Sequence, residues 1–198
     1  MLGASLWADR VATILSEAAA KLPQGFFCSF DYTTTGQNFC HPIAWGSLVR
    51  GLAISSDEFV GIDVRLNDLA GCKFQPDVVL FNRALQPIVC IDYESPNSSD
   101  ARVPYKDVQA LLTWQKATAS HTDYVIVTTL PDANRPSWEV RYTAPGKYND
   151  GFGNRKSEIR ENPFRFWHAI YAEALTPITE GNVAWVNLDQ KSAKRIFP

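Results

Sequence analysis

Residues 72–94, CKFQPDVVLFNRALQPIVCIDYE, contain two apolar runs separated by a short polar loop. The runs, 72–81 and 86–94, are rich in the Val and Ile residues that favour strands, and the loop has the length of a hairpin connection. The preceding segment, 58–66, alternates apolar and polar side chains with the period of a half-buried strand. The sequence therefore predicts three successive strands that form a meander.

Helical patterns flank this meander on both sides. Apolar residues recur at helical spacing over 7–22, and a second helix is predicted over 103–120. The second helix leads into 123–130, whose unbroken apolar middle indicates a strand covered on both faces. A strand, a helix and a strand in succession normally make the two strands parallel, with a right-handed connection.

Further elements are predicted in residues 25–45 and beyond residue 130. In 25–45, residues 26–30 have the composition of a strand, and the second half is predicted to be irregular because of its turn-forming residues. The elements predicted beyond residue 130 are a strand over 138–143, a helix over 164–175 and a closing strand over 183–188.

The composition is that of a soluble globular protein. The chain has 198 residues, of which 45% are hydrophobic and 20% charged, with a formal net charge of −2. These values exclude disorder and collagen-like repeats, and the length predicts one domain over residues 1–198. The order of the predicted elements makes this an α/β domain with a mixed central sheet flanked by helices. No apolar run approaches the ~20 residues that cross a bilayer, so we expect no membrane partner. Asp9 and Arg10 stand where a signal peptide needs its apolar middle, so we expect a cytoplasmic protein.

Cysteines and histidines give no strong site. The cysteines have no zinc-binding spacing and are expected to be reduced and buried, and the histidines are interpreted as packed or solvated residues. These residues are Cys28, Cys40, Cys72, Cys90, His41, His121 and His168.

Three acids fall close together on the predicted meander. Asp92 and Glu94 project from the same face of one strand, and Asp77 lies in the strand before it, within reach of a short hairpin. Such like charges raise each other's pKa and resist burial unless a cation compensates them. Mg²⁺ (or Mn²⁺) takes oxygen ligands and commonly uses one or two carboxylates with substrate phosphate, which makes phosphodiester hydrolysis the leading chemistry. A chance alignment of solvent-facing acids remains the alternative.

These elements and motifs resemble the PD-(D/E)XK, or restriction-endonuclease-like, nuclease superfamily. The resemblance lies in the element order and in Gln75-Pro76-Asp77 and Asp92-Tyr93-Glu94 on successive strands. Because Ser95-Pro96-Asn97 follows, the chain is most similar to a large bacterial group of predicted endonucleases whose third strand ends in an acid followed by Ser-Pro-Ser or Ser-Pro-Asn. The likeness covers roughly residues 61–148 and implies a restriction-endonuclease-like core that cleaves DNA with Mg²⁺.

The resemblance also implies roles for single residues. Asp77 and Asp92 match the two metal ligands, and the carbonyl of Tyr93 matches an additional ligand. Glu94 departs from the pattern, because the superfamily usually has a lysine there, and Lys106 in the following helix is the candidate replacement.

Further residues are candidates for supporting roles. Glu17 is a possible extra carboxylate from the first helix, as in some relatives. Relatives that cut both strands often work as dimers, so a homodimer is also a possibility that the resemblance raises. The loop that would grip DNA through phosphate contacts contains Lys147, Tyr148, Asn154, Arg155 and Lys156.

Two other functions remain open at this point. The lysine-to-glutamate departure at Glu94 favours a nuclease-like module that binds DNA or assists assembly without cutting. A hydrolase that uses Asp92 and Glu94 as an acid and base pair is less compatible with the pattern, because two acids on one strand face the same way, whereas glycosidase acids flank the scissile bond.

Overall fold

The structure is a computed structural model of the chain, and it describes residues 3–23, 26–27, 37–66, 74–94, 103–129, 182–188 and 192–197. Within these residues lie three helices and six strands. In chain order they are α1 (Ala4–Ala20), α2 (Gln37–Gly51), β1 (Glu58–Ile62), β2 (Val78–Asn82), β3 (Pro87–Glu94), α3 (Val103–Thr118), β4 (Asp123–Thr128), β5 (Val183–Leu188) and β6 (Ala193–Phe197).

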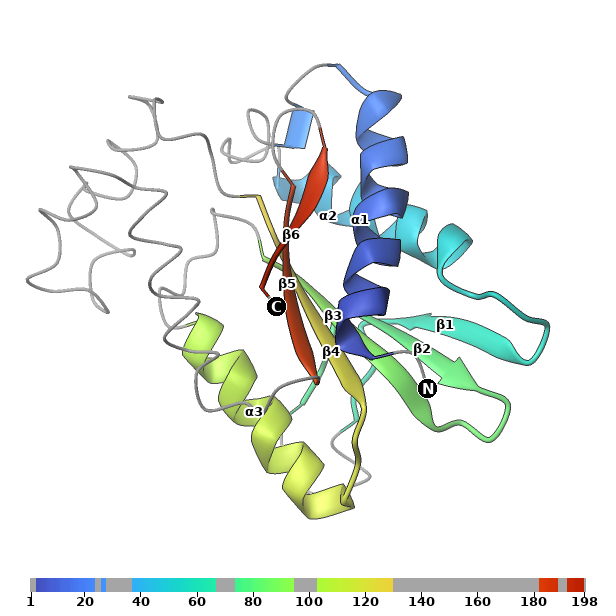
Figure 1. Cartoon of the computed structure of the whole chain (residues 1–198), viewed down its shortest axis with the longest axis vertical. Helices are drawn as coiled ribbons and strands as arrows, with labels where there is room; N and C mark the ends of the chain where they lie inside the picture. The colour runs from blue at the N-terminus through green and yellow to red at the C-terminus, as the bar shows by residue number, and fades with distance from the viewer. Residues whose placement is uncertain are drawn as a thin grey trace, which may run out of the picture.

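The six strands form one mixed sheet in the order β1-β2-β3-β4-β5-β6 (Figure 1). Strands β1, β2 and β3 are antiparallel, which confirms the predicted meander. Strands β3, β4 and β5 are parallel, as expected for β3 and β4 from the helix between them, and β6 returns antiparallel to β5. The protein is therefore a mixed α/β structure with helices against a central sheet.

The helices cover both faces of this sheet (Figure 1). Val89 and Ile91 of β3 belong to one buried core with Trp7, Val11 and Leu15 of α1, and α2 adds to the same core. Burying a side chain of this size contributes roughly 1.5–3 kcal/mol. Because side chains alternate along a strand, the intervening residues of β3 face the other side, where α3 buries Val108, Leu111 and Trp114. This second face carries the acids of β3.

Helix α2 begins within the segment 25–45, whose second half was predicted to be irregular, so that prediction is wrong. The prediction relied on the turn-forming residues 33–37, but Gln37 belongs to the helix, and Pro42 lies inside the helix without ending it. Four buried residues nevertheless recur at every fourth position, which is helical spacing: Cys40, Ala44, Leu48 and Leu52. Phe26 and Phe27 lie in a helical turn, so the strand composition of 26–30 does not give a strand at these two positions.

Two strand predictions also need correction. Strand β1 ends at Ile62, although the alternating pattern runs to Leu66, because Asp63 has a φ of 53° that leaves the extended conformation. Strand β6 was not predicted, because its Lys194 and Arg195 interrupt the apolar pattern of a buried strand.

The remaining predictions concern the cysteines, two elements beyond residue 130 and membrane-spanning helices. Cys40 and Cys90 are buried and unbridged, as expected, whereas Cys28 and Cys72 lie outside the described residues. The predicted strand over 138–143 and helix over 164–175 also lie outside them. In the part of the chain that the structure describes, no helix has the length and apolar character needed to cross a membrane.

Candidate functional site

The β2–β3 hairpin brings Asp77 and Asp92 together. Val78 pairs with Ile91, so Asp77 lies opposite Asp92 one residue beyond this pair. The backbone N–H of Asp77 donates to Oδ1 of Asp92 over 2.9 Å, and the N–H of Tyr93 donates to Oδ2 of Asp77 over 2.7 Å. Each carboxylate thus accepts a backbone hydrogen bond from the opposite strand at the end of the sheet ladder. The proximity that the sequence predicted is present.

Strand β4 contributes a tyrosine that contacts Asp92. Tyr124 pairs with Cys90 in the parallel register, so its side chain lies on the same face as Cys90 and Asp92. Its hydroxyl donates to Oδ2 of Asp92 in a fully buried contact. Both oxygens of Asp92 therefore accept a hydrogen bond, and each keeps a second lone pair for a further partner.

Helix α3 brings a fourth acid, Asp107, to the same place. Glu94 follows Asp92 by two residues on β3, and its carboxyl group is hydrogen-bonded to that of Asp107. A hydrogen bond between two carboxyl groups needs a proton on one of them. Asp77, Asp92, Glu94 and Asp107 are called the acid cluster below.

Burial raises the pKa values of three members of this acid cluster, Asp77, Asp92 and Glu94. It raises the pKa of Asp92 well above the usual range, with Asp107 and Asp77 adding to the increase and the Tyr124 hydroxyl opposing it. Burial also raises the pKa of Glu94, again with a contribution from Asp107. The pKa of Asp77 is raised by burial and lowered by the hydrogen bond from Tyr93. The cluster therefore retains protons at pH values at which isolated acids are ionised.

Helix α2 contributes His41 and Trp45 on the other side of Asp77. Nε2 of His41 lies 3.1 Å from the carbonyl oxygen of Tyr93, and the His41 ring stacks on Trp45 with centroids 5.7 Å apart. Both side chains lower the pKa of Asp77, although the buried indole N–H of Trp45 has no partner at hydrogen-bond distance among the described residues. Sequence reasoning missed this pair because it placed both residues in an irregular segment.

Several predicted site residues have no described side chain. The backbone of Lys106 lies in the first turn of α3, but its side chain is outside what the structure describes. The predicted DNA-gripping residues also lie outside the described part: Lys147, Tyr148, Asn154, Arg155 and Lys156.

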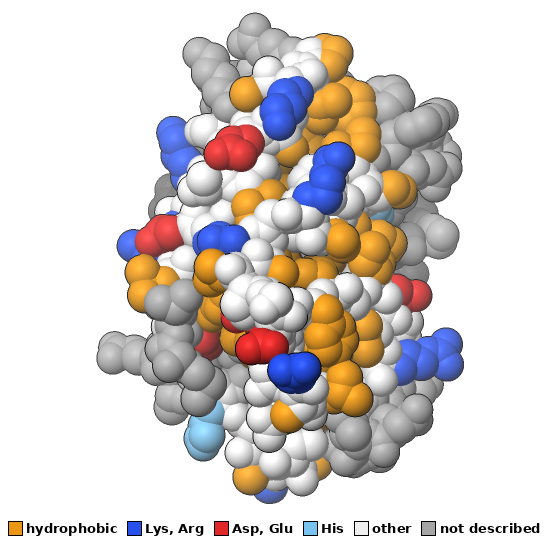
Figure 2. Space-filling view, turned by 90° about the vertical axis from the view of Figure 1, so that its right-hand side faces the viewer, with side chains coloured by type: hydrophobic (Ala, Val, Ile, Leu, Met, Phe, Trp, Pro, Cys, Tyr) orange, Lys and Arg blue, Asp and Glu red, His pale blue; other side chains and the backbone are white. Residues whose placement is uncertain are grey.

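Glu17 lies in a different environment from the acid cluster. It is exposed on α1 and lines a cavity of about 500 Å³ between α1 and α2, with Lys21 and Arg50 among the other lining residues. None of the clustered acids is among the described residues that line this cavity. Figure 2 shows the side of the molecule on the right of Figure 1, where side chains of both charges are scattered among hydrophobic ones. The described residues form no large basic surface there.

The acid cluster offers oxygen donors, which are the ligands that Mg²⁺ and Mn²⁺ prefer. Within the described ranges, no group of three or more His, Cys, Asp or Glu side chains is arranged to hold a metal ion. Mg²⁺ usually needs only one or two carboxylates, because water and substrate phosphate complete its shell. By its donor chemistry, the Asp77 and Asp92 pair fits such a site.

Comparison of the chain with known proteins adds no functional assignment. No family model, curated protein or solved structure matches it.

Proposed function

We propose that the protein is a Mg²⁺-dependent endonuclease that hydrolyses phosphodiester bonds of DNA, with Asp77 and Asp92 as the metal ligands. The observation that carries this proposal is the crossed pair of hydrogen bonds that fixes the two carboxylates at the end of the hairpin. Asp92 is buried and Asp77 partly buried beside two further acids, which is an unfavourable arrangement that a divalent cation would relieve.

Each residue of the site has a chemical task in this proposal. Asp77 and Asp92 bind the cation, and the hydroxyl of Tyr124 holds Oδ2 of Asp92 in place. When bound, Mg²⁺ polarises a phosphoryl oxygen and lowers the pKa of an attacking water. Glu94 and Asp107 share one proton in the hydrogen bond between their carboxyl groups, so the other, ionised carboxyl of this pair would be the group that accepts a proton during hydrolysis.

The arrangement of elements supports a restriction-endonuclease-like core as part of the proposal. The meander β1-β2-β3 is followed by α3 and then by β4, which is parallel to β3. This order agrees with the one that the sequence resemblance implied. Asp92 stands on β3, as the resemblance implied, whereas Asp77 immediately precedes β2 and does not lie within the strand.

The second candidate is a nuclease-like module that binds DNA or assists assembly without cutting it. The hydrogen bond between Glu94 and Asp107 favours this reading, because it puts a second acid at the position where the superfamily usually has a lysine. The two candidates share the fold and differ in metal-dependent chemistry.

Cleavage of supercoiled plasmid with Mg²⁺ or Mn²⁺ tests the proposal. We expect the wild-type chain to nick or linearise the plasmid, and we expect Asp77→Asn and Asp92→Asn to abolish this activity. Asp57→Asn is the matched control, because the exposed Asp57 carboxylate forms a surface ion pair with Arg83 over 3.3 Å. If the wild type leaves plasmid, linear and single-stranded DNA intact with both metals but still binds DNA, the endonuclease proposal is wrong and the module is favoured.

A further inference from the structure

We propose that His41 is a positioning residue for Asp77, acting through the backbone of Tyr93. This inference rests on the proposed function for its consequence in catalysis, because Asp77 is the residue that would bind the metal. Its structural part concerns only a chain of contacts from α2 through β3 to the residue that precedes β2.

Hydrogen bonds hold Tyr93 on both sides of its Cα atom. Its carbonyl oxygen lies 3.1 Å from Nε2 of His41, and its N–H donates to Oδ2 of Asp77 over 2.7 Å. Because a carbonyl oxygen can only accept, Nε2 of His41 must carry the proton. His41 therefore restrains the same backbone residue that orients the Asp77 carboxylate.

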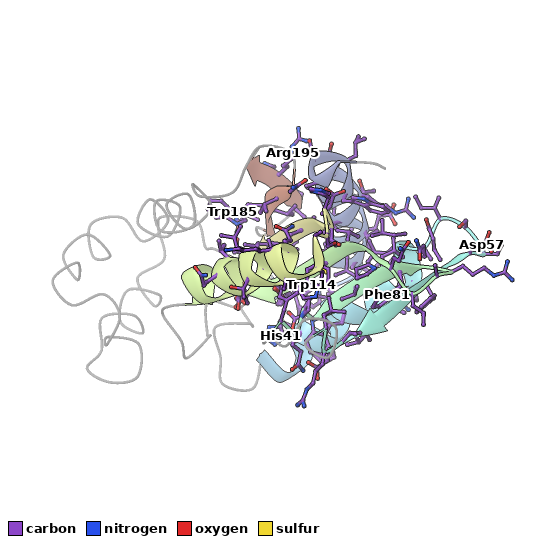
Figure 3. All side chains as sticks on the ribbon, turned by 90° about the horizontal axis from the view of Figure 1, so that it is seen from below. His41, Asp57, Phe81, Trp114, Trp185 and Arg195 are labelled. Atoms are coloured by element: carbon purple, nitrogen blue, oxygen red, sulfur yellow. The ribbon has the colours of Figure 1, made fainter. Side chains whose placement is uncertain are left out.

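The ring of His41 is itself held by two aromatic side chains. It stacks on Trp45, four residues later on α2, with an interplanar angle of 20°. It also meets the buried ring of Tyr93 edge to face, with centroids 4.9 Å apart. Figure 3 labels His41 beside the ribbon of α2. A ring restrained in this way can fix the direction of its hydrogen bond.

The core fixes the position of α2 and hence of His41. Ala44 and Leu48 are fully buried against the core that α1 shares. At the other end of the helix, the guanidinium of Arg10 in α1 donates to the carbonyl oxygens of Gly51 and Leu52. The contact between His41 and Tyr93 is therefore made by two anchored elements, α2 and β3.

A residue that only fills space would give a different mutational result from a positioning residue. The substitution His41→Leu introduces an apolar side chain of similar size and removes the Nε2 donor. Replacing His41 by glutamine keeps a donor at a similar distance from the backbone. If His41 acts by its hydrogen bond, glutamine should rescue what leucine loses.

The test compares the wild type, His41→Leu and His41→Gln, with Arg50→Gln as a control at the exposed end of α2. The first readout is hydrogen exchange of the Tyr93 amide in the metal-free protein, and the others are Mn²⁺ affinity, kcat and KM for DNA. In His41→Leu we expect faster exchange, a loss of about 10–100-fold in Mn²⁺ affinity and a lower kcat with unchanged KM. His41→Gln should stay close to the wild type in exchange and affinity, and Arg50→Gln should change neither.

Unchanged Tyr93 exchange in His41→Leu would overturn the inference, as would a loss in His41→Gln as large as in His41→Leu. If His41→Leu does not fold, the glutamine variant decides by whether it keeps the protection of the wild-type amide. Failure of the proposed function would give a different result from failure of this inference. If the wild type neither binds Mn²⁺ nor cleaves DNA, hydrogen exchange in the metal-free protein still shows whether the Tyr93 amide depends on His41.

Discussion

Tyr124→Phe tests how strongly the site depends on the buried hydroxyl. The substitution keeps the ring against Phe74, whose centroid lies 6.2 Å away, and removes the hydrogen bond to Oδ2 of Asp92. A hydrogen bond to a charged group contributes about 1.5–3 kcal/mol, whereas one between neutral groups contributes about 0.5–1.5 kcal/mol. Because burial raises the pKa of Asp92, we expect the smaller loss at acidic pH and the larger loss once Asp92 ionises.

Urea unfolding of the metal-free protein at several pH values measures this loss. For a chain of this size, the larger loss corresponds to a fall in Tm of roughly 3–12 °C. Mn²⁺ affinity should fall by about 10–100-fold, because Asp92 loses the donor that orients it. A change in unfolding free energy below ~0.5 kcal/mol at every pH would refute this reasoning, since surface substitutions have effects of that size.

Two further predictions concern the acid cluster and the second core face. As pH rises above the ordinary values of 3.8 and 4.5 for Asp92 and Glu94, the folded protein holds protons that the unfolded chain has lost, so stability should fall. Asp107→Asn removes one source of these raised pKa values. In urea unfolding, we therefore expect a higher free energy of unfolding at neutral pH and a weaker dependence of that free energy on pH. An unchanged pH dependence would contradict this prediction. Trp114→Ala should cost about 3–5 kcal/mol in thermal unfolding because Trp114 is only 1% exposed, and a loss below ~1 kcal/mol would contradict its place in the core.

The pairing of the two aspartates was predictable because it depends on local sequence. Two Val- and Ile-rich runs joined by a loop of hairpin length are enough to bring Asp77 near Asp92, whereas the exact register depends on the irregularity between Leu80 and Phe81. The parallel strand β4 was also predictable, because a helix between two strands favours a parallel pair.

The surroundings of the aspartates depend on contacts between distant parts of the chain. Tyr124 reaches Asp92 only because of the register between β3 and β4, and Asp107 reaches Glu94 only because of how α3 is rotated about its axis. The sequence pattern specifies neither the register of the two strands nor the rotation of the helix. His41 was missed for another reason, since the turn-forming residues 33–37 led to an irregular prediction for a segment in which the four-residue spacing of buried side chains indicates a helix.

Calorimetric titration with Mn²⁺ tests most directly whether Asp77 and Asp92 together hold a divalent ion. We predict saturable binding to the wild type and to Asp57→Asn, and no saturable binding to Asp77→Asn or Asp92→Asn. Because the metal displaces protons from groups with raised pKa values, affinity should increase with pH. Equal Mn²⁺ affinity in the wild type and the two aspartate variants, or no saturable binding by the wild type, would contradict the account.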